Sequence, residues 1–317
     1  MSLTDLGWSD FFSSQLTNLQ TENHFASRVT GVHRTGLTLN DGTRELRSKL
    51  GNRWYQESID DQPVIGDWVL VDEQLHVTHL LSRRNVLSRI APNTSDKVQS
   101  IVANIDTLFV VSSCNEEFNE SRLERFLSLA SSANVEATII LTKVDLSPYP
   151  SDYRDRAQKL TANPVRLINA TQEDDCQNLL DYLGPGRTVS LVGSSGVGKS
   201  TIVNGLLGKV VQKTQPVRAT DGKGLHTTTA RSLHVIPDSG VIIDSPGVRE
   251  IALVGDRIDL SSSFNDIEEL AMQCRFNDCR HDKEPDCAIR LAVQNGQLDA
   301  RRWESFLRLS TTKPHSS

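Results

Sequence analysis

The chain has 317 residues, which is long enough for two or three domains. A hydrophobic content of 37% and a charged content of 23% are typical of a globular protein, and no apolar run approaches the roughly 20 residues that span a bilayer. The formal net charge of −6 argues against a protein that coats nucleic acid non-specifically, but it leaves room for RNA binding through a local basic surface.

The N-terminus has neither a basic n-region nor an apolar h-region, so it does not look like a signal peptide. We therefore expect a cytoplasmic protein that contacts no membrane, and we expect a monomer. Five cysteines do not make a disulfide scaffold in a chain of this length.

The first part of the chain predicts a helix followed by strands. Residues 1–26 carry apolar side chains at helical spacing and predict a short amphipathic helix with an irregular arm. Residues 26–90 change to short alternating segments, at 26–33, 36–40, 67–72 and 76–83, with turns between them. Several strands without a helix favour a small closed barrel, for which the OB-fold is the natural candidate. Such a barrel could bind an oligonucleotide, or it could be purely structural or dock a protein.

From residue 106 onward, predicted strands alternate with predicted helices, which indicates a mostly parallel sheet covered on both faces. The strands are expected at 107–111, 137–141, 165–168 and 187–192, and Asn119 is expected to cap the first helix. Two strands joined as a hairpin follow at 230–236 and 240–244. Helices are expected at 154–162 and 174–183, between the strands of the sheet, and again at 264–272, 288–294 and 301–309.

Residues 193–200 match G-x-x-x-x-G-K-[ST], the phosphate loop of nucleoside triphosphatases, between a predicted strand and a predicted helix. The glycines let successive N–H groups point at one anion, and the helix N-terminus faces the same place. Lys199 adds a full charge near the β- and γ-phosphates, and the Ser200 hydroxyl can ligate Mg²⁺. The alternative, a simple Gly/Ser turn, does not explain this context. The expected nucleotide contacts here are Gly193, Ser194, Ser195, Gly196, Val197, Gly198, Lys199, Ser200 and Thr201.

A second motif, D-S-P-G, begins at the end of the apolar run 240–244. The carboxylate of Asp244 can hold the Mg²⁺ shell, and the backbone N–H of Gly247 can reach the γ-phosphate. This motif is what a triphosphate site needs beside the phosphate loop.

A third motif, T-K-V-D, follows the apolar run 137–141 and consists of Thr142, Lys143, Val144 and Asp145. A fixed carboxylate at Asp145 can accept from both N1–H and N2–H₂ of guanine, whereas adenine offers no such pair of donors. The stem of Lys143 can lie over the base. The motif therefore predicts a guanine nucleotide.

Three thiols and one imidazole cluster near the C-terminus, at Cys274, Cys279, His281 and Cys287. This set suits tetrahedral Zn²⁺ without an open position, which is a structural site. The charged residues between the ligands leave no apolar core, so metal binding would supply the ordering energy. Free thiols clustered by chance are the alternative, and an iron–sulfur site is disfavoured by the single His.

The order of the three motifs carries a resemblance to a known family. In GTPases of the translation-factor class, [N/T]-K-x-D follows the phosphate loop, whereas here it precedes the loop, as in a circularly permuted GTPase. With the barrel in front and the Cys/His segment behind, residues 26–310 resemble the RsgA-type (YjeQ) small-subunit ribosome biogenesis GTPases. The resemblance implies an N-terminal arm and OB-type β-barrel (1–92), a circularly permuted α/β P-loop GTPase domain (93–254), and a mainly helical zinc-binding domain (255–317).

The resemblance also implies two details of the base site. The backbone N–H of Ala170, in Asn169-Ala170 where the family usually has S-A, is expected near the guanine oxygen. Position 142 is Thr where GTPases more often have Asn. Because a hydroxyl makes fewer contacts to the base and the loop, this difference affects nucleotide affinity more than specificity.

Residues 221–229 look like the first switch of the family, G-[RK]-G-x-H-T-T. Thr228 is expected to reach Mg²⁺, with Thr227 and Thr229 as alternatives. Val248 stands where many GTPases place a water-orienting Gln, so we hypothesise that His226 orients the attacking water. His226, Lys199 and Thr228 are then the expected catalytic residues; alternatively, His226 only packs or contacts RNA.

The resemblance thus implies a GTP hydrolase that acts as a late-stage assembly factor of the small ribosomal subunit. It would bind rRNA and the subunit, be stimulated by the subunit, and use GTP or GDP with Mg²⁺ and one structural Zn²⁺. One alternative is a phosphate-loop ATPase or a kinase of small metabolites, which the T-K-V-D motif disfavours. Another is an RNA-binding module with a vestigial nucleotide site, which intact Lys199, Ser200 and Asp244 disfavour.

Overall fold

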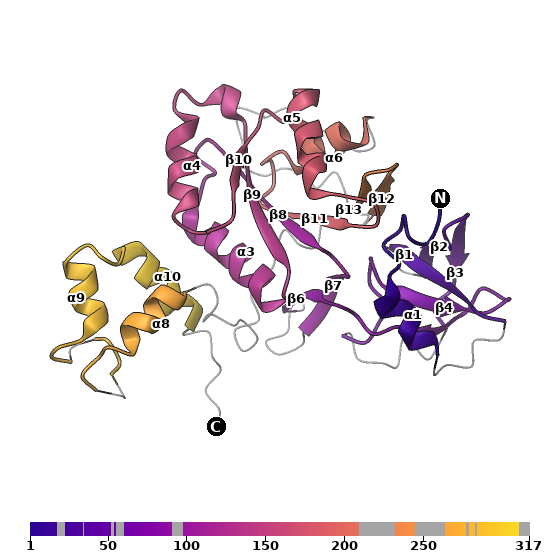
Figure 1. Cartoon of the computed structure of the whole chain (residues 1–317), viewed down its shortest axis with the longest axis horizontal. Helices are drawn as coiled ribbons and strands as arrows, with labels where there is room; N and C mark the ends of the chain where they lie inside the picture. The colour runs from indigo at the N-terminus through magenta and orange to yellow at the C-terminus, as the bar shows by residue number, and fades with distance from the viewer. Residues whose placement is uncertain are drawn as a thin grey trace.

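The computed structural model describes residues 1–17, 23–33, 35–51, 54, 60–90, 98–208, 232–244, 264–276, 279–282 and 284–310. Figure 1 shows a β-rich N-terminal part, a central sheet with helices, and a C-terminal group of helices beside helix α3. Within the described residues, none of the helices combines the length and the apolar character that crossing a membrane requires.

The N-terminal part contains antiparallel strands that pair in the order β3-β2-β1-β4-β5. These strands are β1 (Phe25–His33), β2 (Gly36–Asn40), β3 (Glu45–Ser48), β4 (Trp68–Val71) and β5 (Val77–Leu80). Four of them coincide with the predicted alternating segments, whereas the short β3 was not predicted. Their inward side chains form a core that includes Val29, Leu39 and Val69.

Helix α1 (Asp10–Leu16) is the predicted amphipathic helix, and it covers this part of the sheet. Phe12 on α1 is buried against Trp68 and Leu70 of β4. Trp8, just before the helix, meets the Trp68 ring edge-on at 4.8 Å between centroids. Burial of these aromatic rings supplies the partner that the apolar face of a short helix needs.

Strands β6 (Val86–Ile90) and β7 (Val98–Ala103) form a hairpin that the sequence analysis did not predict. Leu87 and Ile101 of this hairpin belong to the same apolar cluster as helix α3 and the central strands. The hairpin therefore packs with the central part of the chain, and the predicted boundary between residues 92 and 93 falls between its two strands, outside the described residues.

The central sheet has the strand order β10-β9-β8-β11-β13-β12. All neighbours are parallel except β12, which is antiparallel to β13. The strands are β8 (Thr107–Ser113), β9 (Glu136–Thr142), β10 (Val165–Leu167), β11 (Thr188–Val192), β12 (Ser232–Ile236) and β13 (Gly240–Asp244). The predicted mostly parallel sheet is therefore present, with an antiparallel edge that makes it mixed.

Alternate residues of the central strands face two helical layers. On β8, Leu108 and Val110 pack with α3 (Glu120–Ser132) and α4 (Pro150–Gln158). Phe109 and Val111 pack on the other face with α5 (Glu173–Gln177) and α6 (Lys199–Leu207). This alternation explains why every residue of β8 is buried.

Two predicted helices differ in their bounds. Helix α4 begins at Pro150 rather than at residue 154, because proline is pre-organised for the first helical position. The helix predicted at 174–183 ends as α5 at Gln177 and continues as the 3₁₀ turn η2 (Asn178–Tyr182).

The N-terminal strands and the central sheet are hydrogen-bonded to one another. Strand β1 pairs antiparallel with β12, with Gly31 opposite Ser232. The pairing continues the central sheet into the N-terminal strands, a connection between distant segments that the sequence did not predict.

The C-terminal helices are α8 (Asn265–Ala271), α9 (Ala288–Gln294) and α10 (Ala300–Ser310), close to the predicted ranges. Phe264, Ile267, Ile289 and Leu298 form their small apolar core. This core lies beside the Cys/His cluster, to which Cys274, Cys279 and Cys287 contribute.

Candidate functional site

The predicted nucleotide-binding motifs meet at one edge of the central sheet. Thr142 ends β9, Gly193 follows β11, and Asp244 ends β13. Because the carboxyl ends of parallel strands share one edge, these residues gather there although they are far apart in the chain. The chain leaves β8 toward β9 and later returns to β11 on the other side of β8, so this edge holds a topological switch point, where α/β proteins bind ligands.

The phosphate loop is tightly packed at its base and open at its crest. Gly193 has φ 147°, and a Cβ there would lie 2.2 Å from the carbonyl oxygen of Val111. Gly198, the N-cap of α6, has φ 99° in the left-handed region, which only glycine adopts at little cost. Ser195 and Gly196 at the crest are exposed. The loop thus presents its middle to a ligand while its ends are fixed, as a phosphate cradle requires.

Lys199 begins helix α6, and its side chain folds back over the loop. Only 4% of the residue is exposed, and Nζ donates to the carbonyl oxygens of Gly193, at 2.7 Å, and of Ser194. Ser200 and Thr201 share this first turn and are partly buried. The ammonium, the helix N-terminus and the open crest therefore concentrate positive potential at one place, which fits a bound triphosphate.

Thr142 connects the T-K-V-D motif to the phosphate loop. Its hydroxyl donates to the carbonyl oxygen of Val197 at 2.6 Å, and the carbonyl oxygen of Ser112 lies 3.2 Å away. Thr142 is fully buried, and its side chain also lies beside Gly198. A threonine at position 142 can thus hold the loop directly, and the two motifs form one structural unit.

The remaining base-site residues follow the ends of neighbouring strands. Lys143 has a left-handed φ of 59° and leads into the 3₁₀ turn η1 (Val144–Leu146). Asp145, in that turn, is exposed, so a base lying against it would cover the carboxylate. Ala170 follows β10, in a turn where Asp175 accepts from the N–H of Asn169 at 2.6 Å.

Asp244 is buried at the end of β13, with 1% of the residue exposed. A buried carboxylate beside the phosphate loop suits a hard cation such as Mg²⁺. The other residues expected at the γ-phosphate, His226, Thr228 and Gly247, lie outside the described residues.

The distances within the Cys/His cluster fit a four-ligand metal site. The sulfur atoms of Cys274 and Cys287 are 4.0 Å apart, and each lies about 3.5 Å from His281 Nδ1. Zn–S bonds of about 2.3 Å at tetrahedral angles give S···S separations near 3.8 Å. With Cys279, the ligand atoms all lie within 4.8 Å of one another, and the three cysteines are free thiols. The cluster is therefore compatible with zinc.

Local groups prepare two of these ligands for metal binding. Burial acts to raise the pKa of Cys274, but the N–H groups of Ala288 and Ile289, together with the thiols of Cys279 and Cys287, outweigh it and the pKa lies below its usual value. Burial lowers the pKa of His281, which favours the neutral imidazole. The thiolate and the neutral imidazole are the forms that bind metal.

Comparisons with known proteins agree with this geometry. The family model for the RsgA GTPase matches residues 80–254. The small ribosomal subunit biogenesis GTPase RsgA 2 of Vibrio vulnificus is 44% identical over 97% of this chain and 87% of its own length. The chain belongs to the RsgA GTPase family.

Two solved structures show the same fold. The crystal structure of YjeQ from Thermotoga maritima has a TM-score of 0.64 at 22% identity and covers 91% of this chain and 98% of its own. The structure of YloQ, described as a circularly permuted GTPase, has a TM-score of 0.62 at 20% identity and covers 94% and 99%. The predicted permuted GTPase fold is therefore confirmed, and RsgA membership does not favour the ATPase or kinase alternative.

One contact at the phosphate loop was missed by the sequence analysis. Arg122, in the first turn of α3, donates from Nη1 to the hydroxyl oxygen of Ser194. The predicted cap at Asn119 is confirmed, because its side chain accepts from the N–H of Arg122 at 2.9 Å. That cap places residue 122 in the first turn, but nothing local in the sequence indicates that its side chain reaches the loop.

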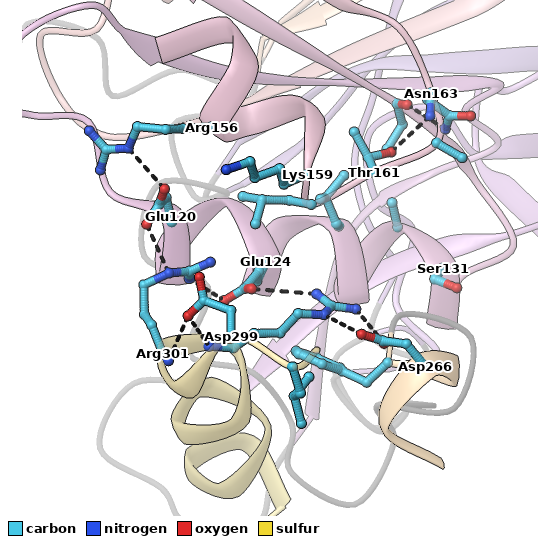
Figure 2. Close-up of a pocket in the computed structure, with 18 of the residues that line it drawn as sticks. Glu120, Glu124, Ser131, Arg156, Lys159, Thr161, Asn163, Asp266, Asp299 and Arg301 are labelled. Carbon is cyan, nitrogen blue, oxygen red and sulfur yellow. Dashed lines mark hydrogen bonds and ion pairs between the residues drawn. The ribbon is translucent and has the colours of Figure 1, made fainter. Parts of the chain in front are cut away.

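Helix α3 also holds the C-terminal helices through a network of ion pairs (Figure 2). Glu124, with only 2% of its side chain exposed, lies 3.2 Å from Arg301 and 3.5 Å from Arg302. Arg301 also pairs with Glu120 at 2.8 Å, and Arg302 pairs with Asp266 at 2.7 Å. These residues line a cleft of about 960 Å³ between α3, α4 and the C-terminal helices. In this member of the RsgA family, ion pairs thus hold the C-terminal helices α8 and α10 against helix α3.

Proposed function

We propose that this chain hydrolyses GTP and acts as a late-stage assembly factor of the small ribosomal subunit. Membership of the RsgA GTPase family supports the hydrolase, and the relatives' name supports the ribosomal role. The observation that carries the proposal is the contact of Thr142 with Val197, because it unites a guanine-type motif and a phosphate loop that the chain encodes in permuted order.

In this proposal, the loop residues Gly193, Ser194, Ser195, Gly196, Val197, Gly198, Lys199, Ser200 and Thr201 bind the phosphates. Thr142, Lys143, Asp145 and Ala170 form the base site. Asp145 specifies guanine, because its exposed carboxylate can accept from N1–H and N2–H₂ of one base edge. Lys199 meets the β- and γ-phosphates from its position over the loop.

The catalytic step in the proposal relies on Lys199, His226 and Thr228. Asp244, Ser200 and Thr228 would hold Mg²⁺, and Gly247 would donate to the γ-phosphate. When bound, Mg²⁺ neutralises charge on the β- and γ-phosphate oxygens. His226 would orient the attacking water.

The proposal includes one structural Zn²⁺ at Cys274, Cys279, His281 and Cys287, where four ligands leave no open position. The proposed domains are the N-terminal arm and barrel (1–92), the GTPase domain (93–254) and the zinc-binding domain (255–317). The N-terminal strand order β3-β2-β1-β4-β5 supports an OB-type barrel, although the described residues contain no pairing of β3 with β5. The barrel and the zinc domain would bind rRNA, and the protein would be a cytoplasmic monomer.

Hydrolysis of GTP with and without purified small ribosomal subunits tests the function. We expect slow hydrolysis by the protein alone, a clear increase with small subunits, and no increase with large subunits. Lys199→Ala should abolish both rates. A rate that small subunits leave unchanged would contradict the ribosomal role, and hydrolysis of ATP at the same rate would contradict the guanine site.

A further inference from the structure

The contact of Arg122 with Ser194 is the first link of a continuous chain of contacts to Lys199. Arg122 Nη1 donates to the hydroxyl oxygen of Ser194, and the carbonyl oxygen of the same residue accepts from Lys199 Nζ. The second carbonyl oxygen that holds the ammonium, at 2.7 Å, belongs to Gly193, the neighbouring residue. A shift of the Gly193–Ser194 segment would therefore move these two acceptors together.

The backbone of Arg122 is fixed from several sides. Asn119 caps the helix by accepting from the N–H of Arg122 at 2.9 Å. The next residue, Leu123, is buried in the core beneath α3. Glu120 and Glu124 are held by the arginines of α10, as Figure 2 shows. The guanidinium of Arg122 thus reaches Ser194 from a rigid base, which is what positioning a flexible loop requires.

The two contacts of α3 use different faces of the helix. Glu120 and Glu124 are one turn apart and face α10, whereas residue 122 lies roughly 200° around the helix from each of them, at 3.6 residues per turn. Arg122 is therefore directed away from the ion pairs with α10. Its guanidinium also lies 3.9 Å from Glu117, but both of those side chains are partly exposed, so this ion pair contributes little.

We propose that Arg122 is a positioning residue of the nucleotide site: by holding Ser194 it keeps the carbonyl groups that orient Lys199 in place. The inference rests on the proposed GTPase function and adds a residue to that same site. Arg122 acts on the loop in the ground state, and it acts alike for GTP and GDP because both carry the β-phosphate that Lys199 meets.

This role predicts a particular kinetic signature. Loss of an interaction made equally in the ground state and in the transition state raises KM and leaves kcat unchanged. An arginine that touched the transferring phosphoryl group would instead change kcat by about 10³-fold or more. The split between KM and kcat therefore distinguishes positioning from direct catalysis.

The test uses the whole 317-residue chain with Arg122→Ala, Arg122→Lys and Ser194→Ala. Arg125→Ala is the matched control, since Arg125 lies on the same helix and is exposed. Dissociation constants for fluorescent GTP and GDP and steady-state KM and kcat are measured for each, and thermal unfolding checks that each variant is folded. We expect Arg122→Ala to weaken both nucleotides by about fivefold, the size of one hydrogen bond from a charged donor at a half-exposed site.

The other variants assign the effect to the contact. Arg122→Lys keeps a cationic donor and should stay within about twofold of wild type, because a single hydroxyl acceptor does not need a planar fork. Ser194→Ala should cost nothing further in the Arg122→Ala background, since the two residues act as one unit. Arg125→Ala should match wild type.

Three results would overturn the proposal: equal affinities for Arg122→Ala and Arg125→Ala, additive losses in the double variant, or a large fall in kcat at unchanged KM. A wild-type protein that neither binds nor hydrolyses GTP would instead contradict the proposed function. The two failures are therefore distinguishable in one set of measurements.

Discussion

The hydroxyl of Thr142 donates to the carbonyl oxygen of Val197 at 2.6 Å, across fifty-five positions of the chain. The contact joins the end of β9 to the phosphate loop after β11, two strands that both flank β8. Through it, a motif that is encoded before the phosphate loop becomes part of the same site. The motifs therefore meet in space although the chain encodes them in permuted order.

Removing the Thr142 hydroxyl should weaken nucleotide binding. In Thr142→Val the carbonyl of Val197 loses its donor at a buried place, which costs about 1–3 kcal/mol. We expect GTP and GDP to bind about tenfold more weakly, by titration with fluorescent nucleotide. Thr142→Ser keeps the hydroxyl and is the control. A Val variant with wild-type affinity would show that the contact does not support the loop.

Asp145→Asn should change which base binds. The carboxamide cannot accept from both donors of guanine, so we expect GTP affinity to fall by about 10³-fold. The carboxamide can donate to the 2-carbonyl of xanthine, so the variant should bind xanthosine triphosphate more tightly than the wild type does. Asp145 is exposed, so folding should be unaffected.

Asp152→Asn, an exposed aspartate on α4, is the matched control for this exchange and should keep wild-type preference. Competition against fluorescent GDP measures both variants. If Asp145→Asn still preferred guanine over xanthine, the base would have to lie elsewhere.

Zinc removal should disorder the C-terminal part. We expect about one zinc per purified chain, as four ligands predict. Cys287→Ser, or a strong chelator, should lower the zinc content and expose the α8–α9 region to protease, because the small core there depends on the metal. Cys114→Ser is the control, since that thiol lies outside the cluster. Elemental analysis that finds no zinc in wild-type protein would refute the assignment.

Arg302 should hold the C-terminal helices against α3. Arg302→Met removes one arginine from the buried Glu124 and leaves Arg301 in place, so we expect this docking to weaken by about 2 kcal/mol, less than an uncompensated buried charge would cost. Hydrogen exchange at the face of α10 toward α3 should rise in this variant. Arg290→Ala, an exposed arginine on α9, should leave exchange unchanged. Equal exchange in the two variants would mean that charge does not fix the interface.

The same ion pairs make the docking of the C-terminal helices on α3 sensitive to acid. Burial acts to raise the pKa of Asp266, but the hydrogen bonds and charge of Arg302 outweigh it and the pKa lies below its usual value. A carboxyl with a lowered pKa stabilises the folded state above its unfolded pKa, about 3.9, and loses this contribution as the pH falls through the lower folded value. Asp266 should thus leave docking constant between pH 5 and 8.

Local motifs made much of the site predictable from the sequence. The phosphate loop and the Cys/His cluster are each contained in one short segment, so their chemistry follows from spacing alone. The motif at Thr142 could likewise be recognised from the sequence, and the order of the motifs indicated the fold that the RsgA relatives share.

Contacts between distant segments were not predictable in this way. Nothing near Arg122 or Ser194 identifies the other as its partner, because the pairing depends on how α3 packs on the sheet. The sequence likewise does not identify Glu124 and Arg302 as partners, because their ion pair forms only where their two helices pack together. Strand β1 was predicted from its own segment, but its pairing with β12 depends on tertiary packing that periodicity does not encode.

Displacement of fluorescent GDP by unlabelled nucleotides shows whether Asp145 and Lys199 bind one guanine nucleotide. We expect GTP and GDP to displace the probe at similar concentrations, and ATP to fail to displace it at about a thousandfold excess. Displacement by ATP at the same concentration as GTP would contradict it.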